Sequence, residues 1–267
     1  MNTNESQVNA ANGEQAEATR LPDDMLIILP VRNMVLFPGV VLPVAIKRDK
    51  TVAGAQEAVQ TESKVGFLLQ KDPNTEEPDF DDLAEMGTVA SIVRYVTAPD
   101  GTHHLVCQGE QRFRVVDKVE GFPYLVARVE YLDDAGLADP QIEAHTHFLQ
   151  QKAAEAIALL PQAPAELAQA IRAIESPSTL ADTIASFLDV KPEEKQQLLE
   201  MLDVRERMQS VAAHLTQRVE VLMLSRQIEE QTKGALDERQ KEMLLREQMR
   251  QIRKELGEDG AGADEHA

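Results

Sequence analysis

The chain has 267 residues, with 46 acidic and 27 basic side chains, a formal net charge of −19 and one cysteine. A field of this sign repels nucleic-acid phosphates and anionic lipids, so we expect protein partners rather than nucleic acid or a membrane. The single Cys107 excludes a disulfide framework and favours a reducing, cytoplasmic location. Apolar runs such as residues 40–46 are too short to span a bilayer, and residues 1–20 lack the pattern of a signal peptide.

Residues 1–24 are polar and unpatterned, which is typical of a disordered leader. The next segment, 25–134, consists of short β-branched runs separated by turn signals. Strands are predicted at residues 25–31, 40–46, 65–70, 88–97, 103–108, 112–119 and 124–132, with a short helix at 51–60. Gly109 is predicted to be a turn, and the acidic residues 71–85 a solvated loop. This spacing favours a small, mostly antiparallel β barrel or sandwich.

The sequence after Gly136 is predicted to be helical. Asp139-Pro140, Pro164, Ser176-Pro177 and Pro192 are expected to begin four helices of a bundle over 135–202. One long, coiled-coil-like helix is predicted over 203–256, followed by a flexible acidic linker at 257–267. The fold class is therefore α+β: a small barrel or sandwich, a helical bundle and one extended helix.

The long helix is predicted from apolar residues at three- and four-residue steps, which begin at Val204 and resume at Leu245 after a polar stretch. About 50 helical residues would reach roughly 80 Å, which is more than a compact domain can bury. Part of this helix must therefore meet a partner or lead to another domain. Asp203 and Glu206 match a capping box, and Gly234 is predicted to be a bend or hinge.

Several segments, in this order, resemble the N-terminal region of the Lon family of ATP-dependent proteases. They are Leu29-Pro30-Val31-Arg32-Asn33-Met34-Val35-Leu36-Phe37-Pro38, Gly87-Thr88-Val89-Ala90-Ser91-Ile92, Gly109-Glu110-Gln111-Arg112-Phe113, Leu180-Ala181-Asp182-Thr183-Ile184-Ala185, Asp203-Val204-Arg205-Glu206-Arg207 and the stretch 245–257. The resemblance implies a β-rich domain plus helical bundle that recognises unfolded or tagged protein substrates. It also implies other subunits of a homo-oligomer, a hexamer in the family, as partners.

The chain departs from the full family pattern in its catalytic parts. It contains no G-x-x-x-x-G-K-[ST] phosphate loop and no counterpart of the family's Ser–Lys protease domain. We therefore expect no catalytic, cofactor or metal residues in this chain; ATP and Mg belong to the absent ATPase domain. Two interpretations stay open: a recognition and delivery module of a Lon-like protease, or a stand-alone receptor that never joins an ATPase.

Two apolar segments are candidates for contact with substrates. The first is Met34, Val35, Leu36, Phe37 and Pro38, for which we favour the alternative of ordinary barrel core. The second lies on the long helix at Met243, Leu244, Leu245 and Met249, where packing between subunits is favoured over direct substrate contact.

The remaining candidates have simpler explanations. Six basic residues of the long helix form the sequence's one basic concentration, and a solvated helix face is favoured over an anionic partner: Arg239, Lys241, Arg246, Arg250, Arg253 and Lys254. The side chains of His103 and His104 are expected to point to opposite faces of a strand, so they cannot bind one metal ion together. Cys107 is predicted to be a buried strand residue.

Overall fold

A computed structural model describes residues 21–160 and 164–255. Six strands form one mixed sheet in the order β2-β5-β4-β3-β1-β6, and a further β5–β6 pairing closes five of them into a barrel. The strands are β1 (Met25–Val31), β2 (Val41–Ile46), β3 (Val65–Leu69), β4 (Met86–Thr97), β5 (His103–Val119) and β6 (Val126–Leu132). β1 and β3 pair in parallel, whereas the other strand pairs are antiparallel. Helix α1 (Asp49–Gln60) packs on β1.

β5 corrects the prediction of two strands separated by a turn at Gly109. It is one strand of 17 residues whose first half pairs with β2 and whose second half pairs with β6. Gly109 is needed because the loop after β1 crosses it: a Cβ there would lie 2.2 Å from the Phe37 carbonyl oxygen. Its N–H donates to Val40 O and its carbonyl accepts from Gly39 N, both at 2.9 Å. The glycine therefore marks a close backbone approach and not a chain reversal.

The helical part contains α2 (Ile142–Leu159), α3 (Ala165–Arg172), α4 (Pro177–Phe187), α5 (Pro192–Glu200) and α6 (Val204–Glu255). Ser176 caps α4 as predicted, since its hydroxyl accepts from the Thr179 N–H. α2 begins later than predicted, because the Asp139 carboxylate bonds the Gln141 N–H in a turn that precedes the helix. The acidic loop 71–85 is also more ordered than predicted: it contains the short 3₁₀ helix η1 (Phe80–Asp82) and the buried Leu83.

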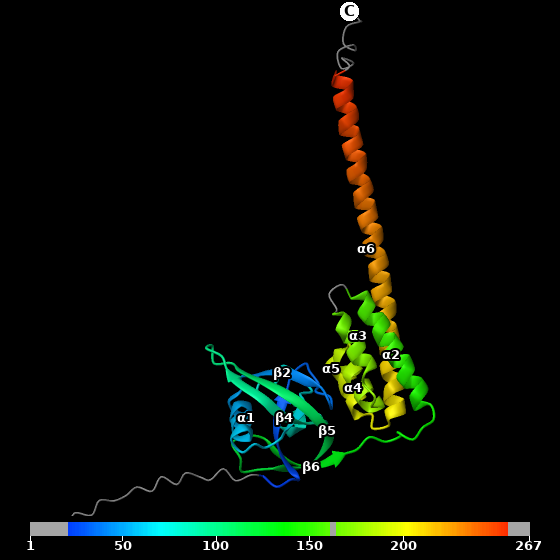
Figure 1. Ribbon diagram of the computed structural model, residues 1–267. Coiled ribbons are helices and arrows are strands. Elements are labelled where there is room, and N and C mark those ends of the chain that lie inside the picture. The colour runs from blue at the N-terminus through cyan, green and yellow to red at the C-terminus, as the bar shows by residue number, and fades with distance from the viewer. Residues whose placement is uncertain (1–20, 161–163, 256–267) are drawn as a thin grey trace, which may run out of the picture.

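Barrel and bundle share one apolar core, which runs from Leu29 and Phe37 in the barrel to Leu149 and Leu180 in the bundle. The buried residues of α6 end at Val219. Leu222 still lines a groove of the bundle, and beyond it the helix extends alone (Figure 1). The 52 residues of α6 correspond to about 78 Å. The predicted α+β class, with a barrel, a bundle and one extended helix, is confirmed.

No helix in the described ranges is long and apolar enough to cross a membrane.

Candidate functional site

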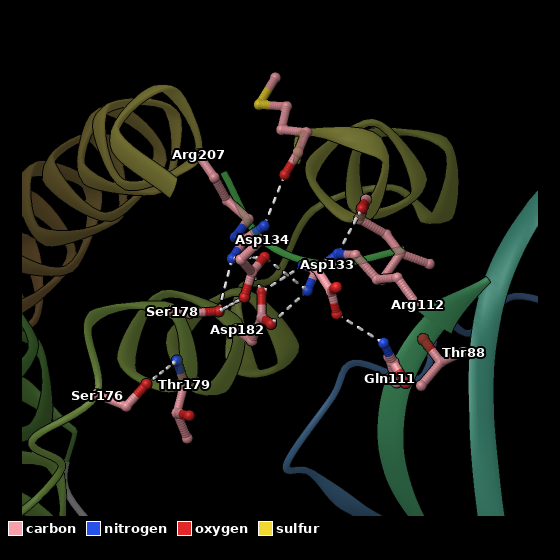
Figure 2. A network of polar contacts seen from close by, with 12 residues as sticks. Thr88, Gln111, Arg112, Asp133, Asp134, Ser176, Ser178, Thr179, Asp182 and Arg207 are labelled. Carbon is pink, nitrogen blue, oxygen red and sulfur yellow. Dashed lines mark hydrogen bonds and ion pairs between the residues drawn. The ribbon is translucent and has the colours of Figure 1, made fainter. Parts of the chain in front are cut away.

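A buried polar network joins the barrel to the bundle. Arg112 extends from β5 and forms two bonds with the Asp182 carboxylate of α4, at 2.9 and 2.7 Å, while its Nε donates to Leu199 O at 2.8 Å. Figure 2 shows both arginines of the network, Arg112 and Arg207, approaching the same pair of carboxylates. A bidentate guanidinium–carboxylate pair fixes orientation as well as distance. This contact therefore sets the angle between β5 and α4.

The second arginine, Arg207, belongs to the first turns of α6. It donates to Asp134 Oδ1 at 2.8 Å, to Ser178 Oγ at 2.7 Å and to Met201 O at 2.6 Å. Its Nε lies 3.2 Å from Asp182 Oδ1 without hydrogen-bond geometry, so this contact is an ion pair only. Ser178 also donates to the second oxygen of Asp134. The start of α6 is thereby tied to α4 and to the segment that leaves the barrel.

The network balances its own charge with two arginines and two aspartates. Burial raises the pKa of Asp182, and the bonds and charge of Arg112 oppose this shift. Burial also acts to raise the pKa of Asp134, but bonds from Ser178 and Arg207 and the charges of both arginines outweigh it and hold that pKa below its ordinary value. Because guanidinium groups stay charged at any physiological pH, both carboxylates are needed to neutralise them.

Two further contacts fix the same junction. Gln196 of α5 donates to Met86 O of β4 at 2.9 Å. Ala135, just after the barrel, forms a parallel bridge with Asp203, immediately before α6. These contacts therefore hold the barrel, the bundle and the base of α6 together as one unit. The exposed apolar surfaces of the chain are attached to this unit.

The bundle carries an apolar groove of about 210 Å³ between α2, α3, α4 and α6. Ile157, Ile171, Ile184 and Leu215 contribute to its lining, and Phe187 lies at this groove with 70% of its surface exposed. A large aromatic side chain that is exposed to solvent beside an apolar groove is unusual unless a binding partner covers the surface. The described bundle therefore offers an apolar surface at this groove.

The predicted apolar loop after β1 is mostly core. Val35, Leu36 and Phe37 are buried, and the Thr88 hydroxyl bonds to Leu36 O at 2.5 Å. Met34 and Pro38 are half-buried. The favoured interpretation as barrel core is confirmed for the three buried side chains, which offer no free surface. A substrate contact through Met34 and Pro38 stays a prediction.

The predicted apolar face of the distal helix is exposed in this structure. Its four members are between 51% and 74% exposed: Met243, Leu244, Leu245 and Met249. Among the basic residues of this region, Arg246 bonds Glu242 at 2.6 Å, as its four-residue spacing predicts. α6 runs through Gly234 as a continuous helix. A hinge function for Gly234 stays a prediction.

Other candidate residues have structural roles. Cys107 is buried in β5, and burial raises the pKa of its thiol to about 12, so it remains protonated and unreactive at neutral pH. His103 bonds the hydroxyls of Tyr95 and Thr97 through Nδ1. Within the described parts of the chain, no group of three or more His, Cys, Asp or Glu could hold a metal ion.

The network residues Arg112, Asp182 and Arg207 were not predicted to act together. A signal was present: Asp182 lies within the apolar face formed by Leu180, Ala181 and Ile184, and a charge on such a face needs a buried partner. Phe187 and its groove left no comparable signal, because the lining comes from four separate helices.

Comparison with known proteins assigns this architecture to a protein family. Residues 25–217 match the family described as the ATP-dependent protease La (LON) substrate-binding domain. The Lon protease of Paraburkholderia phytofirmans is 50% identical over 258 residues, covering 96% of this chain and 32% of that protein. The Lon protease of Escherichia coli K12 is 32% identical over 255 residues, with 96% and 32% covered. The chain thus spans about a third of the length of these relatives.

Solved structures agree on the fold. The N-terminal domain of Lon protease from the Mycobacterium avium complex has a TM-score of 0.59 at 26% identity, covering 72% of this chain and 98% of that one. A Lon N-terminal domain protein from Xanthomonas campestris, at 19% identity and a TM-score of 0.51, shares the fold, covering 71% of this chain and 97% of that one. The family match ends at residue 217, two residues before the last buried residue of α6. The chain therefore belongs to the Lon family, as its N-terminal substrate-binding region.

Proposed function

We propose that this chain captures apolar segments of unfolded or damaged proteins and presents them to the ATPase and protease domains of a Lon-type protease. Degradation driven by ATP is proposed only for a whole protein built like the relatives, because the chain spans about a third of them. In this proposal the barrel and bundle bind the apolar segment, and α6 sets the distance between that segment and the ATPase and protease domains.

The observation that carries this proposal is the apolar groove in a domain whose family is described as substrate-binding. An unfolded polypeptide differs from its native form chiefly in the apolar side chains it exposes. A groove of about 210 Å³ is lined mainly by aliphatic side chains, together with Phe187, Asp189 and Arg218, and is suited to one such apolar side chain at a time. Binding would be weak for each segment and tolerant of sequence, as a quality-control module requires.

The outer part of α6 is proposed to hold subunits together. Residues 220–255 correspond to about 54 Å of helix, and the apolar positions Leu224, Ile228, Leu245, Met249 and Ile252 are exposed along it. Packing these positions against a neighbouring subunit would remove them from water and support a hexamer. A stand-alone receptor would have no use for this exposed length, so we favour the protease over the adaptor.

The test compares one protein in two states. Reduced, carboxymethylated α-lactalbumin and its native form are titrated against the full chain by fluorescence anisotropy. We expect binding of the unfolded form only, and about a tenfold loss of affinity in Phe187→Ser. The matched control is Phe122→Ser, because Phe122 is also a partly exposed phenylalanine but lies in the turn before β6. Equal binding of the two lactalbumin forms would refute the proposed function.

A further inference from the structure

A second pocket, of about 250 Å³, lies in the barrel domain where β1, the loop after it and β2 meet the start of α1. Its apolar lining includes Pro30, Val31, Met34, Val44 and Ile46. Three cationic residues, Arg32, Lys47 and Arg48, line the same pocket. In a chain with a net charge of −19, a pocket that combines apolar lining with three cations needs an explanation. The basic residues of the distal helix are therefore not the chain's one basic concentration.

The two arginines are held side by side by a backbone oxygen. Arg32 Nη2 donates to Thr75 O at 3.1 Å, and Arg48 Nη2 donates to the same oxygen at 3.3 Å and to Gln70 Oε1 at 2.6 Å. The loop that supplies Thr75 is rich in acids, yet its Glu77 pairs with Lys50 at 3.2 Å. Among the described residues, no carboxylate lies within 4.0 Å of a nitrogen of either arginine.

This arrangement leaves two like charges adjacent. Burial and the charge of Arg32 lower the pKa of Arg48, and Glu77 opposes this only in part. In the described structure, the bonds of both side chains use Nη2 alone, so Nε and Nη1 keep their donors. Each guanidinium therefore retains N–H groups for an anionic ligand.

The backbone also places Met34 beside the arginine pair. Asn33 has a φ of 56°, a left-handed conformation that a non-glycine residue adopts at a cost. This turn lets its two neighbours, Arg32 and Met34, line the same pocket. The pocket therefore combines a cationic and a flexible apolar side chain from one turn of the chain.

We propose that this pocket binds the C-terminal carboxylate of a polypeptide substrate, with the last side chain of that substrate, a small apolar one, against Met34 and Val44. This inference rests on the proposed function, since it names a feature by which substrates are selected. The carboxylate would neutralise the arginine pair, and planar guanidinium groups match its geometry. The aliphatic lining would exclude strongly hydrated anions such as free phosphate, whose oxygens it could not satisfy.

The test uses three fluorescent ten-residue peptides of one sequence ending in Ala-Ala: a free acid, a C-terminal amide, and an amide whose last residue is Asp. Each is titrated against the full 267-residue chain. We expect the free acid to bind about tenfold more tightly than the amide, because the charge-assisted bonds are lost in the amide. The amide ending in Asp is expected to bind like the plain amide, because its carboxylate is displaced from the chain end.

Arg32→Gln is expected to remove the preference for the free acid. The matched control Lys118→Gln, which removes an exposed cation of β5 that pairs with Asp81 and lies outside the lining of this pocket, is expected to keep it. Thermal melts verify that both variants fold. Equal affinity for acid and amide, unchanged preference in Arg32→Gln, or tight binding of the amide ending in Asp would each overturn the proposal. Unfolded lactalbumin measured on the same samples reports the proposed function separately, since that binding is assigned to the bundle groove.

Discussion

Replacing Asp182 by Asn tests whether the buried network holds barrel and bundle together. Asp182 is fully buried and faces Arg112 and Arg207, whose side chains are 2% and 0% exposed. The substitution leaves two buried guanidinium groups with Asp134 as their one remaining counter-charge in the network. Removing one partner of a buried ion pair costs about 3–5 kcal/mol. We expect a loss of this size in the free energy of unfolding.

The matched control is Asp24→Asn. Asp24 also pairs with an arginine, Arg128 at 3.3 Å, but both side chains are more than half exposed. Solvent screening reduces such a surface pair to about 0.2–1 kcal/mol. The two substitutions therefore remove the same charge from pairs that differ mainly in burial.

Urea titration of both variants should be followed by two probes. Far-UV circular dichroism is dominated by the helices, whereas alkylation of the buried Cys107 reports opening of the barrel. Because Arg112 is in β5 and Asp182 in α4, we expect both transitions of Asp182→Asn to shift together. A loss no larger than that of Asp24→Asn, or a shift of the helical transition alone, would refute the view that the network joins the two parts.

Three further outcomes follow from particular residues. Cys107, with its pKa raised to about 12, should react with iodoacetamide at pH 8 only at the rate at which the barrel opens; rapid labelling of the folded chain would contradict its burial. Gly109→Ala should lower stability by about 1–3 kcal/mol or more in thermal melts, because the new Cβ meets Phe37 O at 2.2 Å; an unchanged melting temperature would show that the loop yields. The lowered pKa of Asp134 means that its stabilising effect is present above the ordinary carboxyl pKa of about 3.9 and is lost as pH falls through its folded-state value. The stability gap between the natural chain and Asp134→Asn should therefore close in acid, and a gap that stays constant down to pH 2 would contradict this sign.

Local patterns predicted much of the fold. Short β-branched runs predicted β1, β2 and β3 nearly to the residue, and the Ser176-Pro177 pair predicted the start of α4. The stepwise apolar pattern from Val204 predicted the long helix. These features depend on neighbours in sequence, where periodicity and capping operate.

One error arose where distant segments meet, and another arose within a turn. Gly109 was predicted to be a turn because glycine is common in turns, whereas here it allows the loop containing Phe37 to cross a continuous strand. Asp139 was predicted to cap α2, but its carboxylate bonds inside the preceding turn. In both cases the residue type was a correct signal of an unusual backbone. A tertiary contact decided its form at Gly109, and a local bond two residues along the chain decided it at Asp139.

The candidate sites show the same limit. The network of Arg112, Asp182 and Arg207 joins segments far apart in the chain, as does the pair of Arg32 and Arg48 in the barrel pocket. The sequence shows Asp182 and Arg32 within largely apolar segments, but it could not indicate which charges meet. By contrast, Leu245, Met249 and Ile252 follow three- and four-residue steps that the sequence alone shows, and all three are exposed.

The central claim, that this domain captures unfolded segments in the bundle groove, is tested most directly by site-specific photo-cross-linking. A benzophenone amino acid is placed at position 187 in the groove or, as a control, at the exposed position 143, in the first turn of α2 and outside the lining of the groove. With carboxymethylated α-lactalbumin we predict cross-links from 187 and few from 143, and none from either position with native lactalbumin. Cross-links that are equal at the two positions, or absent from 187, would contradict capture in the groove.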